Sequence, residues 1–301
     1  MGKDVEWVDF FEDDYRYADA INGIIFSGKQ VVSEADLSEL DTRVGKKVRD
    51  LVRKTALGVN FAIVGIENQD EMDYEFPIRI MEYDVKRYKK QVTRTRNQLK
   101  QQKEKLNPGE FLYGFKKDSR LHPVVTFALY SGVKKWDGPL SLHDIIDFTD
   151  IPDELRKLVA DYRIHLIDIR RFKDTSVFKT DLRQVFDFIR CAEDKKALLE
   201  LVSEDEYFKN ISQDTYDVIT KYANLGEGVI KMEKYKGENG EINMCKGLRD
   251  LIDDSKEEGR EELLRGIVIN MLRKNKTIEE ICDLLGCDST YVEAIRKEIE
   301  S

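Results

Sequence analysis

The chain has 301 residues, of which 36% are charged and 41% are hydrophobic, and its formal net charge at pH 7 is −9. This length suits one large domain or two small ones. No apolar run reaches the roughly 18 residues of a membrane-spanning helix, and the first residues lack the basic and apolar parts of a secretion signal. These features predict a cytoplasmic protein with no membrane partner, and the net charge argues mildly against a general polyanion binder.

The cysteine pattern excludes the common zinc sites. No two cysteines form a CxxC pair, and the chain has only three histidines to complete a ligand set. We therefore predict reduced, mostly buried thiols at Cys191, Cys245, Cys282 and Cys287.

The first element in the chain is helical. Residues 5–26 carry apolar side chains at helical spacing, which predicts one or two short helices that end near Gly28.

Two strands joined by a turn follow at 50–66. The run LGVNFAIVGI (57–66) is almost continuously apolar, as expected of a strand covered on both faces, yet it leads into Glu67, Asn68 and Gln69. Such a polar end is either solvated at the sheet edge or placed there to bind something. Asp50, on the preceding strand, favours binding, because antiparallel neighbours come within about 5 Å and two such carboxylates repel without a cation. Mg²⁺ suits an oxygen site of this kind.

A helix opens at Pro77, with a predicted apolar stripe of Ile78, Met81, Val85 and Tyr88. From Asp84 to Lys105 this helix has nine basic residues and two acidic ones. A basic block of this density indicates phosphate contacts, although a solvated helical arm explains it equally well.

Two further strands are predicted at 122–130 and 162–169, with Trp136 covering the sheet between them. We interpret His122 and His143 as structural, hydrogen-bonded residues and not as catalytic bases. Beyond Ile169 the apolar spacing becomes helical, and the sequence around 235–241 is the best linker candidate.

The last segment has the spacing of a helix-turn-helix. Thr277 and Glu280 form a predicted capping box, and Gly286 stands where the turn needs a left-handed residue. The second helix offers Arg296 and Lys297 to DNA but also carries acidic residues, so packing or homo-oligomerisation through the C-terminal helices is the favoured role.

Three blocks of the sequence resemble a known family. RDLVRKTALGVNFAIVGIENQ (49–69), EFPIRIMEYD (75–84) and HPVVTFALYSGVKKWDGPLSL (122–142) are similar to the recombination-promoting nuclease and transposase-like family of the PD-(D/E)XK nuclease superfamily. The resemblance covers about the first half of the chain and depends on the order and spacing of the three blocks.

The resemblance implies a metal site and a DNA substrate. Asp50 and Glu67 correspond to the metal ligands, with Asn68 as a further candidate, and Gln69 stands where Lys usually orients the attacking water. Asp4 and Asp19 are possible additional ligands, although a solvated helical aspartate is the simpler interpretation of each. Arg79 corresponds to a position beside the active site, where it contacts phosphate, and Tyr83 to a packing residue. The candidate DNA contacts are Arg79, Lys86, Lys89, Lys90 and Arg94.

The sequence therefore predicts an α/β protein with a restriction-endonuclease-like core, a mixed sheet flanked by helices. The predicted parts are a nuclease-like domain at 1–175 with a basic arm at about 84–118, a helical extension at 176–235 and a C-terminal helical module at 236–301. The predicted function is Mg²⁺-dependent hydrolysis of DNA phosphodiester bonds in recombination. Two alternatives remain: a catalytically weak or inactive module of a mobile-element or defence system that binds DNA or protein, and a strand-transfer transposase.

Overall fold

The computed structural model describes residues 5–39, 51–66, 73–102, 107–223, 232–238 and 240–300. The chain divides into two compact units, which are treated separately below. The first comprises residues 1–207 and 211–227, and the second comprises 208–210 and 228–301. Residues 176–207, predicted as part of a separate helical extension, lie in the first unit together with the sheet.

The first unit is built on a mixed sheet. Its five described strands are β1 (Ser38–Glu39), β2 (Leu51–Ala56), β3 (Val59–Ile66), β4 (Val124–Tyr130) and β5 (His165–Asp168), and they lie in that order. The strand β2 runs antiparallel to its neighbours β1 and β3, whereas β4 is parallel to both β3 and β5. The predicted α/β class and the predicted strands are confirmed, with β5 shorter than expected.

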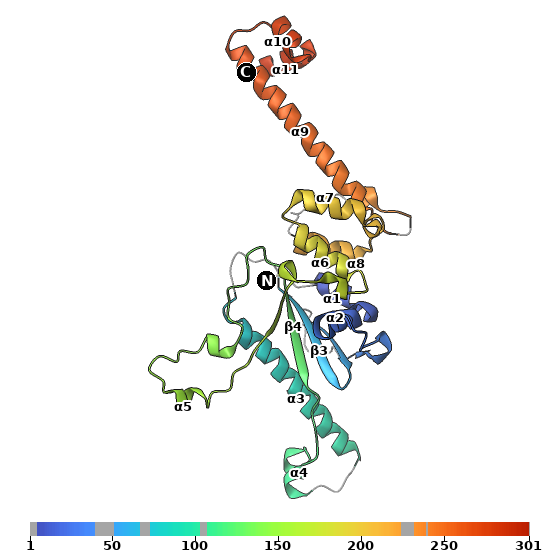
Figure 1. Cartoon of the computed structure of the whole chain (residues 1–301), viewed down its shortest axis with the longest axis vertical. Coiled ribbons are helices and arrows are strands. Elements are labelled where there is room, and N and C mark those ends of the chain that lie inside the picture. The colour runs from blue at the N-terminus through green and yellow to red at the C-terminus, as the bar shows by residue number, and fades with distance from the viewer. Residues whose placement is uncertain are drawn as a thin grey trace. The chain divides into compact units, whose positions relative to one another are not determined.

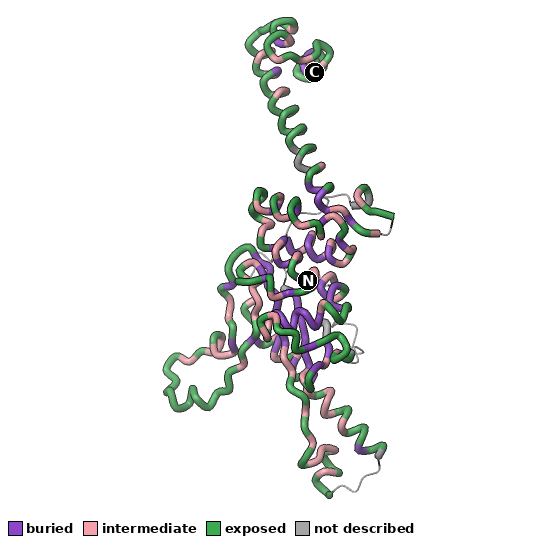
Figure 2. The backbone as a smooth tube through the Cα atoms, turned by 45° about the vertical axis from the view of Figure 1, so that its right-hand side comes forward, coloured by how far each residue is buried: buried purple, intermediate pink, exposed green. Residues whose placement is uncertain are grey.

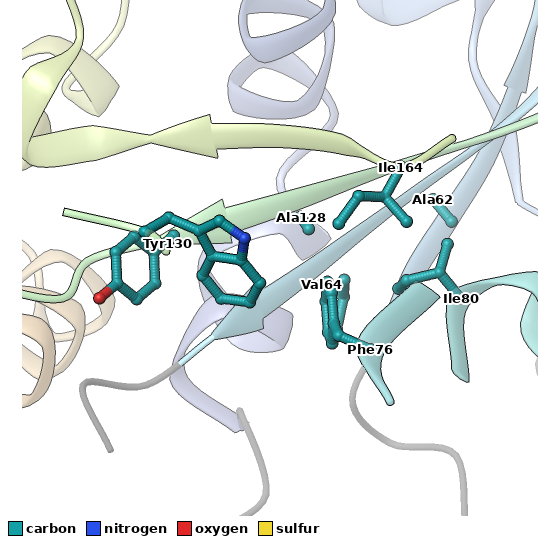
Figure 3. Close-up of a cluster of buried hydrophobic side chains, with 8 residues drawn as sticks. Ala62, Val64, Phe76, Ile80, Ala128, Tyr130 and Ile164 are labelled. Carbon is teal, nitrogen blue, oxygen red and sulfur yellow. The ribbon is translucent and has the colours of Figure 1, made fainter. Parts of the chain in front are cut away.

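One face of the sheet is covered by the first half of α3 (Phe76–Gln102). Alternate residues of β3 and β4 point toward this helix, as period-two strands require. Figure 3 shows the resulting cluster, in which Phe76 and Ile80 of α3 lie against side chains of the strands. Trp136 and the partly buried Tyr83 pack on the same cluster, which confirms the packing roles predicted for both.

The other face is covered by the helices α1 (Val5–Glu12) and α2 (Asp14–Phe26), and the helices α6 (Leu182–Cys191) and α8 (Gln213–Tyr222) pack against these two (Figure 1). Gly65 of β3 lies so close to this layer that an added Cβ would come within 2.4 Å of the Trp7 ring and 3.0 Å of the Tyr222 hydroxyl. A glycine at this position therefore lets the helical layer approach the strand. Of the one or two N-terminal helices predicted, the structure has two; the second ends at Phe26 and is followed by left-handed Ser27 and Gly28.

The described part of the first unit also contains the shorter α-helices α4 (Pro108–Tyr113), α5 (Asp153–Arg156) and α7 (Lys195–Glu204). His122 Nδ1 is 2.9 Å from the Gly58 carbonyl oxygen, and His143 Nε2 is 2.9 Å from that of Val159. Both histidines thus have the structural role predicted for them.

The apolar stripe predicted for α3 is wrong. Ile78 and Val85 are exposed and Met81 and Tyr88 are only half-buried, whereas the buried residues of α3 include Phe76, Ile80, Asp84 and Arg87. The helix is turned differently from the prediction because of a polar contact that helical spacing does not reveal. The Asp84 carboxylate accepts hydrogen bonds of 2.5 Å from Thr126 Oγ1 on β4 and from the Tyr162 hydroxyl ahead of β5. With these partners a carboxylate can be buried.

The second unit consists mainly of three helices, α9 (Met244–Arg273), α10 (Ile278–Leu285) and α11 (Ser289–Glu300). Val268, Ile281, Val292 and Ile295 form their shared core. The predicted capping box is present, since Thr277 Oγ1 accepts from the Glu280 amide and Glu280 Oε2 accepts from the Thr277 amide. The largely acidic segment 250–262 lies within α9.

The cysteines are free, as predicted, but Cys245 alone is buried and the other three are half-buried. None of the helices in the described ranges combines the length and the apolar character that crossing a membrane requires.

The buried carboxylate generates a first prediction. Asp84→Ala removes the acceptor of two buried hydroxyl groups, so the free energy of unfolding should fall by about 3 kcal/mol. Tyr162→Phe removes one of the two bonds and should cost about half as much. Burial and the hydrogen bond to Asp84 raise the pKa of Tyr162, so this hydroxyl remains a donor throughout the usual pH range. Urea unfolding measures the effect.

The control is Glu82→Ala on the same helix. Glu82 forms an exposed ion pair with Lys86, which contributes less than about 0.5 kcal/mol. Equal losses of stability in Asp84→Ala and Glu82→Ala would contradict the role of the buried bonds.

A second prediction compares two glycines of the C-terminal unit. An added Cβ meets nothing within 4 Å at Gly266 or at Gly286, but only Gly286 has a left-handed backbone, with φ +63°. Gly266→Ala, inside α9, should stabilise the unit by about 0.5–1 kcal/mol. Gly286→Ala should destabilise it by about 1 kcal/mol. Hydrogen exchange of amides 278–299 in the full chain measures both changes in stability. If the two variants changed the protection of these amides in the same direction, the argument from backbone conformation would be wrong.

Candidate functional site

The described ends of four strands meet at one edge of the sheet. Leu51, which begins β2, pairs with Val64 near the end of β3. Ile66, the last residue of β3, pairs with Tyr130, and Tyr130 pairs with Asp168 at the end of β5. The carboxyl ends of parallel strands are the usual place for a ligand in an open α/β sheet.

The predicted metal-binding and catalytic residues lie outside the described residues. Asp50 directly precedes Leu51 in the sequence, and Glu67, Asn68 and Gln69 directly follow Ile66. Their roles stay predictions. The pairing of Leu51 with Val64 nevertheless brings the described chain on both sides to the same edge of the sheet.

The structure adds polar residues at this edge that the sequence did not single out. Asp168 is largely buried and pairs with Arg171, with 3.0 Å between the Asp168 Oδ2 and Arg171 Nη1 atoms. Arg170 donates to the Ser131 carbonyl oxygen at 2.6 Å and to that of Ile189 at 2.7 Å. Burial and the nearby Asp168 carboxylate raise the pKa of Tyr130. The available signal was the sequence IDIRR, in which an acidic residue and two basic residues lie at the end of the predicted strand.

Arg79 lies at the start of α3, near this edge. Its guanidinium is 2.7 Å from the Asp73 carboxylate and lies over the Phe76 ring, 4.7 Å from the centroid. The side chain is 31% exposed. Arg79 is thus held in place by an acid and an aromatic ring, and its predicted phosphate contact requires exchange of the Asp73 partner.

The other predicted DNA contacts form a stripe along α3, defined as Lys86, Lys89, Lys90 and Arg94. Their spacing of three, four and eight residues places them on one side of the helix, beside its buried face. Lys86 pairs with Glu82 at 3.0 Å, whereas Lys90 is half-buried and Lys89 and Arg94 are exposed. The basic stripe is therefore largely accessible to a polyanion.

Two charged residues that the sequence associated with function have structural roles. Arg87, one of the nine basic residues, is buried and donates to the Asn60 side-chain oxygen at 3.1 Å. Asp19, considered as a metal ligand, is buried and accepts from the Lys179 and Thr180 amides and from the Thr180 hydroxyl. Asp4 lies outside the described residues. Within the described ranges, no group of three His, Cys, Asp or Glu side chains could hold an ion.

The C-terminal helices α10 and α11 are joined by a short turn, and the helix-turn-helix motif itself stays a prediction. Gly286 ends α10 in the left-handed conformation, and both helices pack on the end of α9 through the shared core. Arg265 of α9 pairs with Glu298 of α11. The predicted packing role is thus present within this unit, and DNA binding and homo-oligomerisation stay predictions.

Together, the mixed sheet and the helices on both of its faces define an α/β protein, with polar residues at one edge of the sheet and a basic stripe along α3. The chain belongs to the family described as "Putative transposase, YhgA-like", whose model matches residues 49–216, more than half of the chain. This family is one of the PD-(D/E)XK nuclease-like families, so the predicted resemblance is confirmed. No curated protein and no solved structure matches the chain.

A third prediction tests the basic stripe. Replacing Lys86, Lys89, Lys90 and Arg94 with Gln should weaken duplex DNA binding and flatten the dependence of log K on log salt, by about 0.9 for each phosphate that the variant no longer neutralises. The measurement is fluorescence anisotropy over a range of salt concentrations. The matched control replaces four exposed lysines elsewhere in the unit, Lys157, Lys173, Lys195 and Lys196. If both variants had the same slope of log K against log salt, the stripe would not contact phosphates and would be only a solvated part of the helix.

Proposed function

We propose that this protein is a metal-dependent DNA endonuclease that hydrolyses phosphodiester bonds, in the recombination or transposition setting that its family suggests. The sheet, with helices on both faces, is then a restriction-endonuclease-like core. The proposed metal ligands are Asp50 and Glu67, with Asn68 as a further oxygen donor, and the proposed ion is Mg²⁺.

The observation that carries the proposal is the pairing of β2 with β3. It brings Leu51 and the end of β3 to one edge of the sheet, and the candidate residues adjoin these strand ends in the sequence. Carboxylate and amide oxygens are ligands that Mg²⁺ accepts, usually together with several waters, so this set of residue types fits the ion.

Each proposed residue has a distinct role. When bound, the ion lowers the pKa of a bound water and stabilises negative charge on the scissile phosphate. In this proposal Asp50 and Glu67, which adjoin the ends of β2 and β3 in the sequence, supply the negative charge that would hold the ion. Gln69 orients the attacking water through its amide but, unlike Lys, adds no positive charge. Arg79 and the basic stripe of α3 bind and orient the phosphate backbone.

The fourth prediction concerns this site. Asp50→Ala and Glu67→Ala should each lower Mg²⁺-dependent nicking of supercoiled plasmid by about 100-fold or more, because each removes a ligand or base at the reacting phosphate. EDTA should abolish nicking by the unaltered protein. Gln69→Ala should lower the rate, and Gln69→Lys should preserve or raise it.

Matched controls for this assay are Asp153→Ala and Glu154→Ala, which change exposed acids of α5 in the same unit. Circular dichroism confirms that each variant is folded. Full activity in either Asp50→Ala or Glu67→Ala would remove the metal-site proposal.

A second candidate function is a catalytically weak or inactive DNA- or protein-binding module. The exposed basic stripe favours it, since the stripe can bind phosphates without any metal. Nicking that is absent with every divalent cation, together with salt-dependent DNA binding, would favour this function. The C-terminal unit is proposed to mediate assembly with a second copy, which the molecular mass in solution tests.

A further inference from the structure

Helix α4 presents three consecutive apolar side chains to solvent. The exposed fractions are 78% for Phe111, 73% for Leu112 and 67% for Tyr113. Figure 1 shows α4 beyond the end of α3 that projects from the sheet, and Figure 2 shows that this arm is mainly exposed or intermediate. A cluster of large exposed apolar groups is characteristic of an interaction site.

Helix α4 forms the tip of the arm, and its conformation is fixed by hydrogen bonds. Asn107 and Glu110 form a reciprocal capping box, with bonds of 2.8 and 3.0 Å. Arg96 Nε of α3 donates to the Tyr113 carbonyl oxygen at 2.8 Å, which ties α4 to α3. The three side chains are therefore displayed by an ordered turn, and binding through them requires little further ordering.

The charge around the tip indicates the chemistry of its partner. The described residues of the basic arm, 84–102 and 107–118, include nine Lys or Arg and three Asp or Glu. A second exposed apolar segment, at Ile151, Leu155 and Leu158, has the opposite charge, since residues 147–161 include five acidic and two basic residues. The partner of the arm tip is therefore a polyanion.

The distribution of this charge favours DNA over an anionic membrane. Lys86 and Lys100 are 14 residues apart on one helix, a distance of about 21 Å, or about six base-pair steps. A membrane surface would meet the tip with the basic groups level with it. Here the basic groups extend far behind the tip, as needed to follow a chain of phosphates.

We propose that the arm tip inserts its apolar side chains into duplex DNA. The rings of Phe111 and Tyr113 stack on bases and unstack one step, while the basic stripe of α3 follows the adjacent phosphates. Apolar wedges of this kind kink a duplex where a protein also contacts the backbone. The inference deepens the proposed function, because it depends on DNA as the substrate, but it does not depend on cleavage.

The test uses a duplex that carries 2-aminopurine, whose fluorescence rises on unstacking, with the full chain in EDTA so that no cleavage can occur. The unaltered protein should raise the fluorescence at saturation. The triple variant Phe111→Ala, Leu112→Ala, Tyr113→Ala should lose this rise and bind about tenfold or more weakly, with an unchanged salt slope because no charge is altered. The matched triple variant Ile151→Ala, Leu155→Ala, Leu158→Ala should behave like the unaltered protein.

The single variant Phe111→Leu serves if the triple variant does not fold, since it keeps an apolar group and removes one ring. It should reduce the fluorescence rise. The proposal is overturned by unaltered protein that binds without any fluorescence rise, by tip variants that behave like the unaltered protein, or by tip-dependent binding to phosphatidylserine vesicles with none to DNA. A tip-dependent rise without nicking would remove the nuclease function and leave this inference standing.

Discussion

The buried carboxylate of Asp84 is the constraint on which the first unit depends. A carboxylate inside a protein is strongly unfavourable unless its oxygens are hydrogen-bonded, and here a hydroxyl from β4 and another from the chain entering β5 supply those bonds. These contacts fix the rotation of α3 on the sheet. They also fix which of its residues face solvent, because each face of a helix is determined once one residue is placed.

The rotation of α3 links the core to the candidate functional surfaces. With Phe76, Ile80 and Asp84 turned toward the sheet, the basic stripe lies on the accessible side of the same helix. The helix is 27 residues long, so it covers the sheet with its first turns and carries α4 well beyond it. Stability of the core and presentation of the arm are thus properties of one helix.

In the proposed function, the polar edge of the sheet suits hydrolysis of a phosphodiester bond, whereas the basic arm suits binding of the nucleic-acid backbone. Phosphate contacts position a nucleic acid without reading its sequence, whereas hydrolysis needs groups placed within hydrogen-bond reach of one phosphate. The edge is built from strand ends held by backbone pairing, which favours fixed geometry. The C-terminal helices α10 and α11 belong to the other compact unit and lie beyond the matched family region.

Local signals in the sequence determined much of this protein. The buried strands, the helix at Pro77, the capping box at Thr277 and the turn at Gly286 follow from residue preferences acting within a few positions of the chain. The order of three blocks indicated the family. Tertiary structure alone decided that Asp84 is buried, because its partners Thr126 and Tyr162 are 42 and 78 residues away. For the same reason it alone turned Arg87 inward and brought Asp168 to the edge where β3 ends, since sheet pairing joins residues that no short-range pattern connects.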